Sequence, residues 1–219
     1  MPNVIVTGGT GFVGYWMKQT QPDGLNCKYI GKLDYHLWYW HVCEWDYVIH
    51  LAPEPPTRAI SAALLNGCRL LYCSSGIIYH SENDTEYRRA KVDGEKQCLD
   101  SGADVVIARL FTFSGERLTP DHAIVAFEQA AQIGQPLHIW GDGSCVRSYM
   151  HGEEMGRLLW AILLHGERGE AYDVGSDEPV TMLELARRYS DDIIIEGGRD
   201  AMPVYLPPDT EKTRKLLPT

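Results

Sequence analysis

The chain has 219 residues, of which 44% are hydrophobic and 23% are charged, values typical of one folded domain or of one domain with a small appendage. Lys and Arg number 20 and Asp and Glu number 30, so the formal net charge at pH 7 is −10. This balance argues against a nucleic-acid or anionic-membrane partner, which needs clustered positive charge, but one or two arginines in a cleft can still hold an anionic substrate.

Short apolar runs alternate along the chain with longer segments of helical periodicity. We expect buried strands at residues 3–7, 27–30, 47–51, 69–74, 105–110 and 171–174. We expect helices at residues 12–19, 58–65, 86–99, 123–133, 153–164 and 182–189. Runs that are apolar throughout, such as residues 105–108, are typical of parallel strands buried on both faces. The sequence therefore predicts an α/β fold, a doubly wound parallel sheet with helices on both faces.

The first expected strand begins almost at once, without the basic and apolar regions of a signal peptide. No apolar run approaches the roughly 18 residues of a membrane-spanning helix. The six cysteines form no C-x-x-C pair and most lie in apolar stretches, which favours reduced core residues. We therefore expect a cytoplasmic protein with no membrane partner.

A glycine-rich turn follows the first expected strand. Gly8, Gly11 and Gly14 form the pattern G-x-x-G-x-x-G between that strand and the first helix. Such glycines let the backbone turn tightly and approach a pyrophosphate, whose charge is stabilised at the helix N-terminus. We interpret the turn as a dinucleotide-binding site rather than a purely structural feature, which makes residues 1–114 a Rossmann-type NAD(P)-binding domain.

The stretch TGGTGFVG at residues 7–14 resembles the fingerprint of the extended short-chain dehydrogenase/reductases, the NAD-dependent epimerase/dehydratase family, whose members act mostly on nucleotide-sugars. The resemblance implies a bound NAD or NADP. The residues implied to contact it at the turn and at the end of the third expected strand are Gly8, Gly11, Phe12, Val13, Gly14, Leu51 and Ala52.

Tyr87 and Lys91 stand four residues apart on an expected helix, so their side chains share one face. A nearby ammonium lowers the pKa of a tyrosine, which lets the phenol act as an acid or base near neutral pH. Y-x-x-x-K alone is common on surface helices, but the resemblance implies that Tyr87, Lys91 and Ser75 are catalytic. It further implies that Tyr87 and Lys91 contact the cofactor, and that Ser75 and Tyr87 contact the substrate.

Alignment of Ile78-Tyr79 with the family's V-Y-G selects Ser75 as the catalytic serine and leaves Ser74 structural. The family's sugar 4,6-dehydratases carry Asp-Glu directly after this position, where the present chain has Gly76 and Ile77. These side chains cannot transfer protons. Dehydration by that route is therefore not expected, and epimerisation or ketone/alcohol redox chemistry remains.

Residues 134–155 resemble G-x-P-x-x-I-x-G-D-G-x-x-x-R-D-F-x-H-V-x-D, a diagnostic segment of the extended members. The resemblance implies that Arg147 holds the substrate's pyrophosphate, a task suited to a guanidinium group, although a surface salt bridge is the alternative. A looser match makes Arg199 a second pyrophosphate contact. We expect residues 115–219 to form a small substrate-binding part, with residues 171–175 returning to the main sheet.

The chain is shorter than the family pattern, and a strand–helix pair after Gly14 is expected to be missing or shrunken. The family's ribose-binding acid would fall near Gly31-Lys32. Lys32 could meet a 2′-phosphate and favour NADP, whereas Asp34 could serve a ribose hydroxyl or the adenine, so both cofactors stay open. Relatives often pair through the helices that flank the catalytic strand, and a homodimer is possible here.

Residues 35–45 are dense in aromatic side chains. A zinc site built from His36, His41 and Cys43 would have three ligands with no common spacing, and we expect no metal. The aromatic residues could instead form a surface for a partner or an adenine ring. We prefer the simpler interpretation, that large rings cover the sheet edge in a shortened segment.

We therefore expect an NAD(P)-dependent nucleotide-sugar epimerase or ketoreductase. A catalytically silent dinucleotide-binding sensor or scaffold is the first alternative, and an intact Ser75, Tyr87 and Lys91 set argues against it. A reductase of a small non-sugar carbonyl compound is the second, and Arg147 argues against that.

Overall fold

Six parallel strands form the main sheet of this computed structural model, which describes residues 1–35, 44–198 and 204–217. The sheet order is β2-β1-β3-β4-β5-β9. The strands are β1 (Asn3–Thr7), β2 (Asn26–Ile30), β3 (Tyr47–His50), β4 (Arg69–Ser75), β5 (Asp104–Leu110) and β9 (Ala171–Val174). Among the described residues only β2 lies beyond β1, where the usual doubly wound order has two strands. The second strand of that order thus has no counterpart in residues 1–35 and 44–198.

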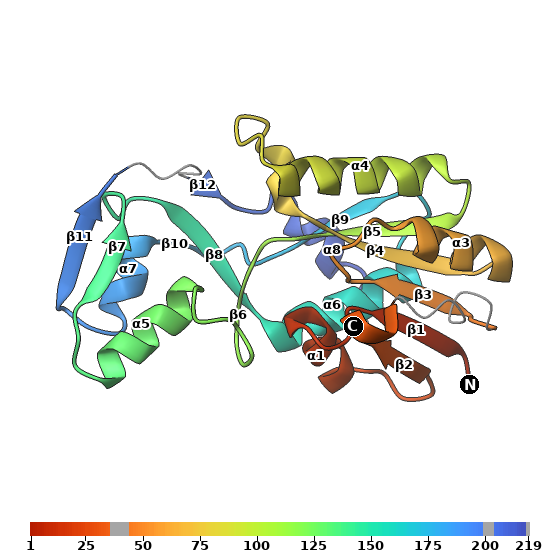
Figure 1. The fold of residues 1–219 in the computed structure, drawn as a ribbon, viewed down its shortest axis with the longest axis horizontal. Coiled ribbons are helices and arrows are strands. Elements are labelled where there is room, and N and C mark those ends of the chain that lie inside the picture. Colours follow the sequence, from red (N-terminus) through yellow and green to blue (C-terminus); the bar gives the residue numbers. More distant parts are fainter. Residues whose placement is uncertain (36–43, 199–203, 218–219) are drawn as a thin grey trace.

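Helices cover both faces of the main sheet (Figure 1). On one face lie α3 (Thr57–Asn66) and α4 (Glu86–Asp100), and on the other lie α1 (Phe12–Gln19) and α6 (Gly152–His165). The alternation of side chains in β1 shows why its sequence is apolar throughout, because Val4 and Val6 pack with α1 and α6 while Ile5 packs with α3 and α4.

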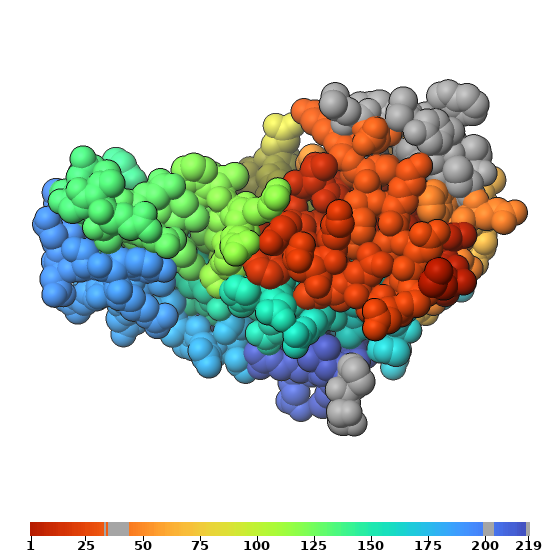
Figure 2. Space-filling model, turned by 90° about the horizontal axis from the view of Figure 1, so that it is seen from below, coloured from red at the N-terminus to blue at the C-terminus, as the bar shows by residue number. Residues whose placement is uncertain are grey.

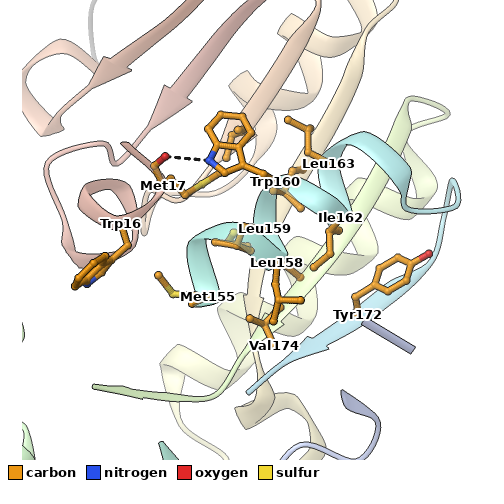
Figure 3. Close-up of a cluster of buried hydrophobic side chains, with 14 of the residues drawn as sticks. Trp16, Met17, Met155, Leu158, Leu159, Trp160, Ile162, Leu163, Tyr172 and Val174 are labelled. Carbon is orange, nitrogen blue, oxygen red and sulfur yellow. Dashed lines mark hydrogen bonds between the residues drawn. The ribbon is translucent and has the colours of Figure 1, made fainter. Parts of the chain in front are cut away.

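Helix α6 packs against both the main sheet and the first helix, α1. Its apolar residues pack beneath the sheet with Trp16 and Met17 of α1, and the Trp160 indole nitrogen donates to the Met17 carbonyl oxygen at 2.9 Å (Figure 3). A Cβ added at Gly156 would lie 2.8 Å from the Trp16 carbonyl oxygen, so the two helices approach closely only because this residue is glycine. The helix that carries the glycine turn is thereby fixed against the main sheet.

The remaining strands build a smaller part at one end of the elongated molecule (Figures 1 and 2). They are β6 (Thr112–Ser114), β7 (Leu137–Trp140), β8 (Val146–His151), β10 (Pro179–Thr181), β11 (Ile193–Gly197) and β12 (Val204–Tyr205). The other helices are α2 (Lys32–Tyr35), the 3-10 helix η2 (Gly76–Tyr79), α5 (Ala123–Gln132), α7 (Met182–Arg187) and α8 (Thr210–Arg214).

Strand β8 is the central strand of the smaller part. It pairs with β10, with β12 and with β6, and the β12 pairing sets Tyr205 beside Arg147. Strand β7 pairs with β11 in a separate two-stranded sheet. Not all of residues 115–219 lies in this smaller part, because β9 belongs to the main sheet and α6 and α8 pack on that sheet.

The expected strands and helices are all present, with bounds that differ by a few residues at most. The strands β6, β7, β8, β10, β11 and β12 were not expected, because none of them is a continuous run of buried residues. Within the described part of the chain, each helix is too short or too polar to cross a bilayer.

Candidate active site

The glycine turn lies between β1 and α1 at the carboxyl ends of the strands. Gly8 has a φ of +72°, and a Cβ there would lie 2.8 Å from the Ala52 backbone nitrogen. A Cβ on Gly14 would lie 2.5 Å from the Gly9 Cα. Gly11 has only the Gly8 carbonyl oxygen near its missing side chain, at 3.5 Å. Two glycines therefore pack the turn against its neighbours, and the third leaves the N-terminus of α1 accessible.

A pocket of about 200 Å³ adjoins the turn on the β2 and β3 side. Its lining residues are Gly8, Thr10, Gly11, Gly31, Lys32, Leu51, Ala52, Pro53 and Glu54. Five of the expected cofactor contacts thus share one pocket. Asp34 lies in α2 and is not among the described residues that line it. A Cβ on Gly31 would lie 2.9 Å from the Thr10 methyl carbon, so an acidic side chain would not fit at that position.

A larger cavity of about 640 Å³ lies on the other side of the turn. Its lining residues are Thr10, Gly11, Phe12, Phe111, Thr112, Phe113, Arg117, Leu118, Thr119 and His122. Phe12 stacks on Phe113 with ring centroids 6.1 Å apart. Thr10 and Gly11 line both hollows, so the two adjoin at the turn and run across the carboxyl ends of the strands.

Lys91 is fixed beside the end of β4. Helix α4 begins after Thr85, whose hydroxyl accepts the Arg88 backbone N–H at 3.1 Å, and this cap sets the register of the helix. The Lys91 ammonium donates to the Cys73 carbonyl oxygen at 2.9 Å and lies 5.8 Å from the Tyr87 ring centroid. Burial lowers the pKa of Lys91. The Tyr87 side chain is 54% exposed, so its face of the helix is open.

Ser75 ends β4 and is buried. Its hydroxyl accepts the Ile77 backbone N–H at 3.3 Å and lies 3.3 Å from the hydroxyl of Tyr205. Among the described interactions no hydrogen bond joins Ser75 to Tyr87. Ser74 is buried too, and its hydroxyl has no partner in the described part of the protein.

Tyr205 is the residue of this region that the sequence did not reveal. Its ring contacts Phe111 at 5.1 Å and His80 at 5.4 Å between centroids. Burial raises the pKa of its hydroxyl. In the sequence Tyr205 is a single tyrosine before Leu206 and belongs to no motif, so the sequence alone does not identify it as a site residue.

Arg147 reaches the same place from β8. Its guanidinium carbon lies 6.0 Å from the Tyr205 ring centroid, and one nitrogen donates to the Val146 carbonyl oxygen at 2.9 Å. The structure thus brings Ser75, Tyr205 and Arg147 together. Arg199, His36, His41 and Cys43 lie outside the described residues.

A network of hydrogen bonds and an ion pair links the elements near the site. Arg109 binds both carboxylate oxygens of Glu95, at 3.1 and 2.8 Å, and donates to the Tyr79 hydroxyl at 2.6 Å. Tyr79 in turn donates to Asp173 at 2.9 Å. This network joins α4, which carries Lys91, to β5, η2 and β9.

The position after Ser75 has no room for an acidic side chain. A Cβ on Gly76 would lie 2.5 Å from Cζ of the Phe111 ring, and Ile77 is buried. The two groups that follow Ser75 therefore cannot supply protons, in agreement with the sequence.

Together, the parallel sheet and the open glycine turn define a Rossmann-type protein of the dinucleotide-binding class. The family model of the NAD dependent epimerase/dehydratase family matches residues 44–175, more than half of the chain, and the chain belongs to that family. The expected family and fold class are confirmed.

Curated relatives match parts of the chain. It is 31% identical over 106 residues to a dTDP-glucose 4,6-dehydratase of Streptomyces niveus, covering 47% of this chain and 32% of the relative. It is 26% identical over 180 residues to UDP-glucuronic acid decarboxylase 2 of Arabidopsis thaliana, covering 69% of this chain and 40% of the relative. The matches thus span about a third to two fifths of the length of these relatives, and they include a 4,6-dehydratase, a class that the sequence analysis did not expect.

Solved structures share the fold over almost the whole chain. The dTDP-glucose 4,6-dehydratase DesIV from Streptomyces venezuelae, with NAD and TYD bound, superposes with a TM-score of 0.82 at 20% identity, covering 98% of this chain and 90% of that chain. A UDP-glucuronic acid 4-epimerase mutant from Bacillus cereus, in complex with NAD and a fluorinated UDP-sugar, gives a TM-score of 0.81 at 17% identity, covering 98% and 92%.

Proposed function

We propose that the protein is an NAD(P)-dependent epimerase or ketoreductase that acts on a hydroxyl or ketone of a nucleotide-sugar. The observation that carries this proposal is the position of Lys91. Its ammonium is fixed at 2.9 Å from the Cys73 carbonyl oxygen, two residues before Ser75, and beside the Tyr87 ring. A partly buried cation therefore lies between the end of β4 and the Tyr87 ring, on the face of α4 that carries Tyr87.

The roles of the three side chains follow from their chemistry. Tyr87 accepts a proton from the substrate hydroxyl or returns one to the ketone, and its exposed face admits the substrate. Lys91 holds its ammonium beside the Tyr87 ring. Ser75 offers a hydroxyl to the reacting oxygen from the end of β4. Nicotinamide, when bound, supplies the hydride acceptor or donor.

The residues around the turn fit a dinucleotide. The pyrophosphate would be held at the N-terminus of α1 by the backbone of Gly11, Phe12 and Val13, with Gly8 and Gly14 allowing the close packing. The pocket with Leu51, Ala52 and Lys32 would take the adenosine end. The solved relatives with NAD in their complexes support NAD or NADP as the cofactor.

The contacts around Ser75 favour this reaction over the alternatives. Gly76 and Ile77 oppose 4,6-dehydration, even though dehydratases are among the relatives. Arg147 beside Tyr205 supports a diphosphate-bearing substrate over a small carbonyl compound. A pure sensor would not need the Lys91 and Tyr87 arrangement. Arg199 as a second pyrophosphate contact, Asp34 as an alternative ribose contact and a homodimer stay predictions.

Binding measurements test the proposal. Calorimetry and thermal shift would use NAD+, NADH, NADP+ and NADPH, each with and without UDP-, GDP-, dTDP- and CDP-sugars. A ligand at one hundred times its Kd stabilises the fold by about 2.7 kcal/mol, which is readily measured. Tight NAD+ binding with a further shift from one nucleotide-sugar supports an epimerase, and a preference for NADPH supports a reductase. Absence of any dinucleotide binding would contradict the proposal.

A further inference from the structure

The larger cavity is lined in part by residues that have no role in the proposed function. Arg117 and His122 line it together with the glycine turn, and none of the described lining residues is Asp or Glu. The chain as a whole carries a net charge of −10. A cavity lined by a cation and lacking carboxylates, in so acidic a protein, is suited to an anion.

The side chain of Arg117 is held in place by its backbone and by Tyr15. Its φ is +69°, and no other non-glycine residue in the described ranges has a positive φ. Such a conformation is strained and persists where the surroundings impose it, often at a binding site. The guanidinium carbon lies 4.7 Å from the centroid of the Tyr15 ring, in α1, and the Tyr15 hydroxyl donates to Glu116 at 2.9 Å. The loop therefore presents its cation against the helix that follows the glycine turn.

Two helices begin at this cavity. Helix α1 starts after Gly11 and α5 starts after His122, and both of these flanking residues line the cavity. The first N–H groups of each helix have no partner within the helix and carry the positive end of its dipole. His122 forms no side-chain cap, and its Nδ1 is buried without a partner among the described residues. The N-termini of α1 and α5 and the residue Arg117 thus line one cavity.

We propose that Arg117 binds the diphosphate of a nucleoside diphosphate ester that lies between the N-termini of α1 and α5. This inference rests on the proposed function, because the diphosphate belongs either to the dinucleotide or to the nucleotide-sugar. The guanidinium fork donates two parallel N–H bonds to phosphate oxygens, while the Tyr15 ring fixes its plane. The contact to α1 favours the dinucleotide as the source.

The test separates charge from backbone strain. Arg117→Gly removes the guanidinium and relieves the left-handed conformation, so its melting temperature should not fall below that of the wild type. Arg117→Lys keeps the charge without the fork, and Tyr15→Leu keeps the arginine without the ring. Arg157→Ala is the control, because this substitution removes the same charge from another surface. Arg157 is exposed on α6 and pairs with Glu153.

NAD+, NADP+, UDP and dTDP are titrated separately into each variant by calorimetry. Loss of a bidentate charged contact should weaken binding roughly tenfold or more in Arg117→Gly, with partial recovery in Arg117→Lys and no change in Arg157→Ala. A loss confined to NAD+ and NADP+ assigns the residue to the dinucleotide, and a loss confined to UDP or dTDP assigns it to the nucleotide-sugar.

Wild-type affinity of Arg117→Gly for all four ligands would overturn the inference and leave the proposed function intact. A wild-type protein that binds none of the four would instead contradict both. A fall in the melting temperature of Arg117→Gly together with weaker binding would also overturn it, because the residue would then be structural.

Discussion

The hydroxyl of Ser75 lies 3.3 Å from the hydroxyl of Tyr205, a residue 130 positions further along the chain. Ser75 ends a strand of the main sheet, and Tyr205 lies in β12, in register with Arg147 of β8. The contact therefore joins the two parts of the protein at the proposed site of chemistry. A serine hydroxyl has one proton and two lone pairs, and one lone pair accepts from Ile77, so a substrate hydroxyl at Ser75 competes with Tyr205 for the positions that remain.

Tyr205→Phe should strengthen binding of the nucleotide-sugar. The ring and its packing on Phe111 are kept, and only the competing hydroxyl is removed. A hydrogen bond worth about 1 kcal/mol corresponds to an affinity gain of roughly fivefold. Calorimetric titration would measure it, with NAD+ affinity as the internal control. Weaker substrate binding would show instead that this hydroxyl contacts the sugar.

Tyr87→Phe should abolish turnover while leaving the fold and cofactor binding intact. The exposed ring stays on α4, but the proton-transfer group is lost, and loss of such a group typically lowers kcat by about 10²- to 10⁴-fold. Steady-state assays would use the nucleotide-sugar identified by binding. Tyr189→Phe is a matched control, because it removes a phenol hydroxyl from a ring that packs on Phe127 in the smaller part of the protein. Unchanged activity of Tyr87→Phe would favour the sensor hypothesis.

Lys32→Ala should distinguish the two dinucleotides. Lys32 lines the adenosine-side pocket, where Gly31 leaves no room for a ribose-binding acid. If its ammonium binds a 2′-phosphate, NADP+ affinity falls by roughly tenfold while NAD+ affinity is nearly unchanged. Asp34→Ala is the complementary variant, and a loss of NAD+ affinity there, with none in Lys32→Ala, would contradict the prediction.

Gly76→Ala should destabilise the fold, because the new methyl group would meet the Phe111 ring, whose Cζ lies 2.5 Å from the Cβ position. Overpacking of this kind costs about 1–3 kcal/mol in the free energy of unfolding. Urea denaturation of Gly76→Ala, Phe111→Leu and the double variant forms a cycle. Simple additivity in that cycle would show that the two residues do not compete for space.

Stability should fall as the pH is lowered because of His50. Its Nε2 lies 2.8 Å from the Glu54 carbonyl oxygen and must donate there, so Nδ1 accepts from the Thr7 hydroxyl at 2.9 Å. Burial lowers the pKa of this neutral imidazole to about 4. The unfolded state has the ordinary pKa of about 6.5 and binds more protons between these values, so the stability present above about pH 6.5 is lost as the pH falls towards about 4.

The expected loss from this group is about 2 kcal/mol between pH 7 and pH 5. Urea unfolding at both values would measure it. His50→Gln retains a donor and an acceptor but does not titrate, so it should flatten this part of the pH dependence. An equally steep dependence in His50→Gln would assign the effect to other groups.

Local spacing in the sequence was sufficient for the glycine turn, the helix after it and the shared face of Tyr87 and Lys91. These features depend on residues within one or two helical turns, so periodicity and glycine positions determine them. The strands of the main sheet could equally be predicted from the sequence, because burial on both faces makes their sequences largely apolar.

The tertiary structure alone decided which distant residues share the site. The contact of Tyr205 with Ser75 depends on a two-residue strand pairing with β8, and so short a strand has no readable pattern. Arg117 has a left-handed backbone and packs its guanidinium on Tyr15, and an arginine in the sequence predicts neither feature. Sequence spacing fixes what is near along the chain, whereas these contacts arise because two sheets, each stabilised by its own core, bring separate segments to one edge.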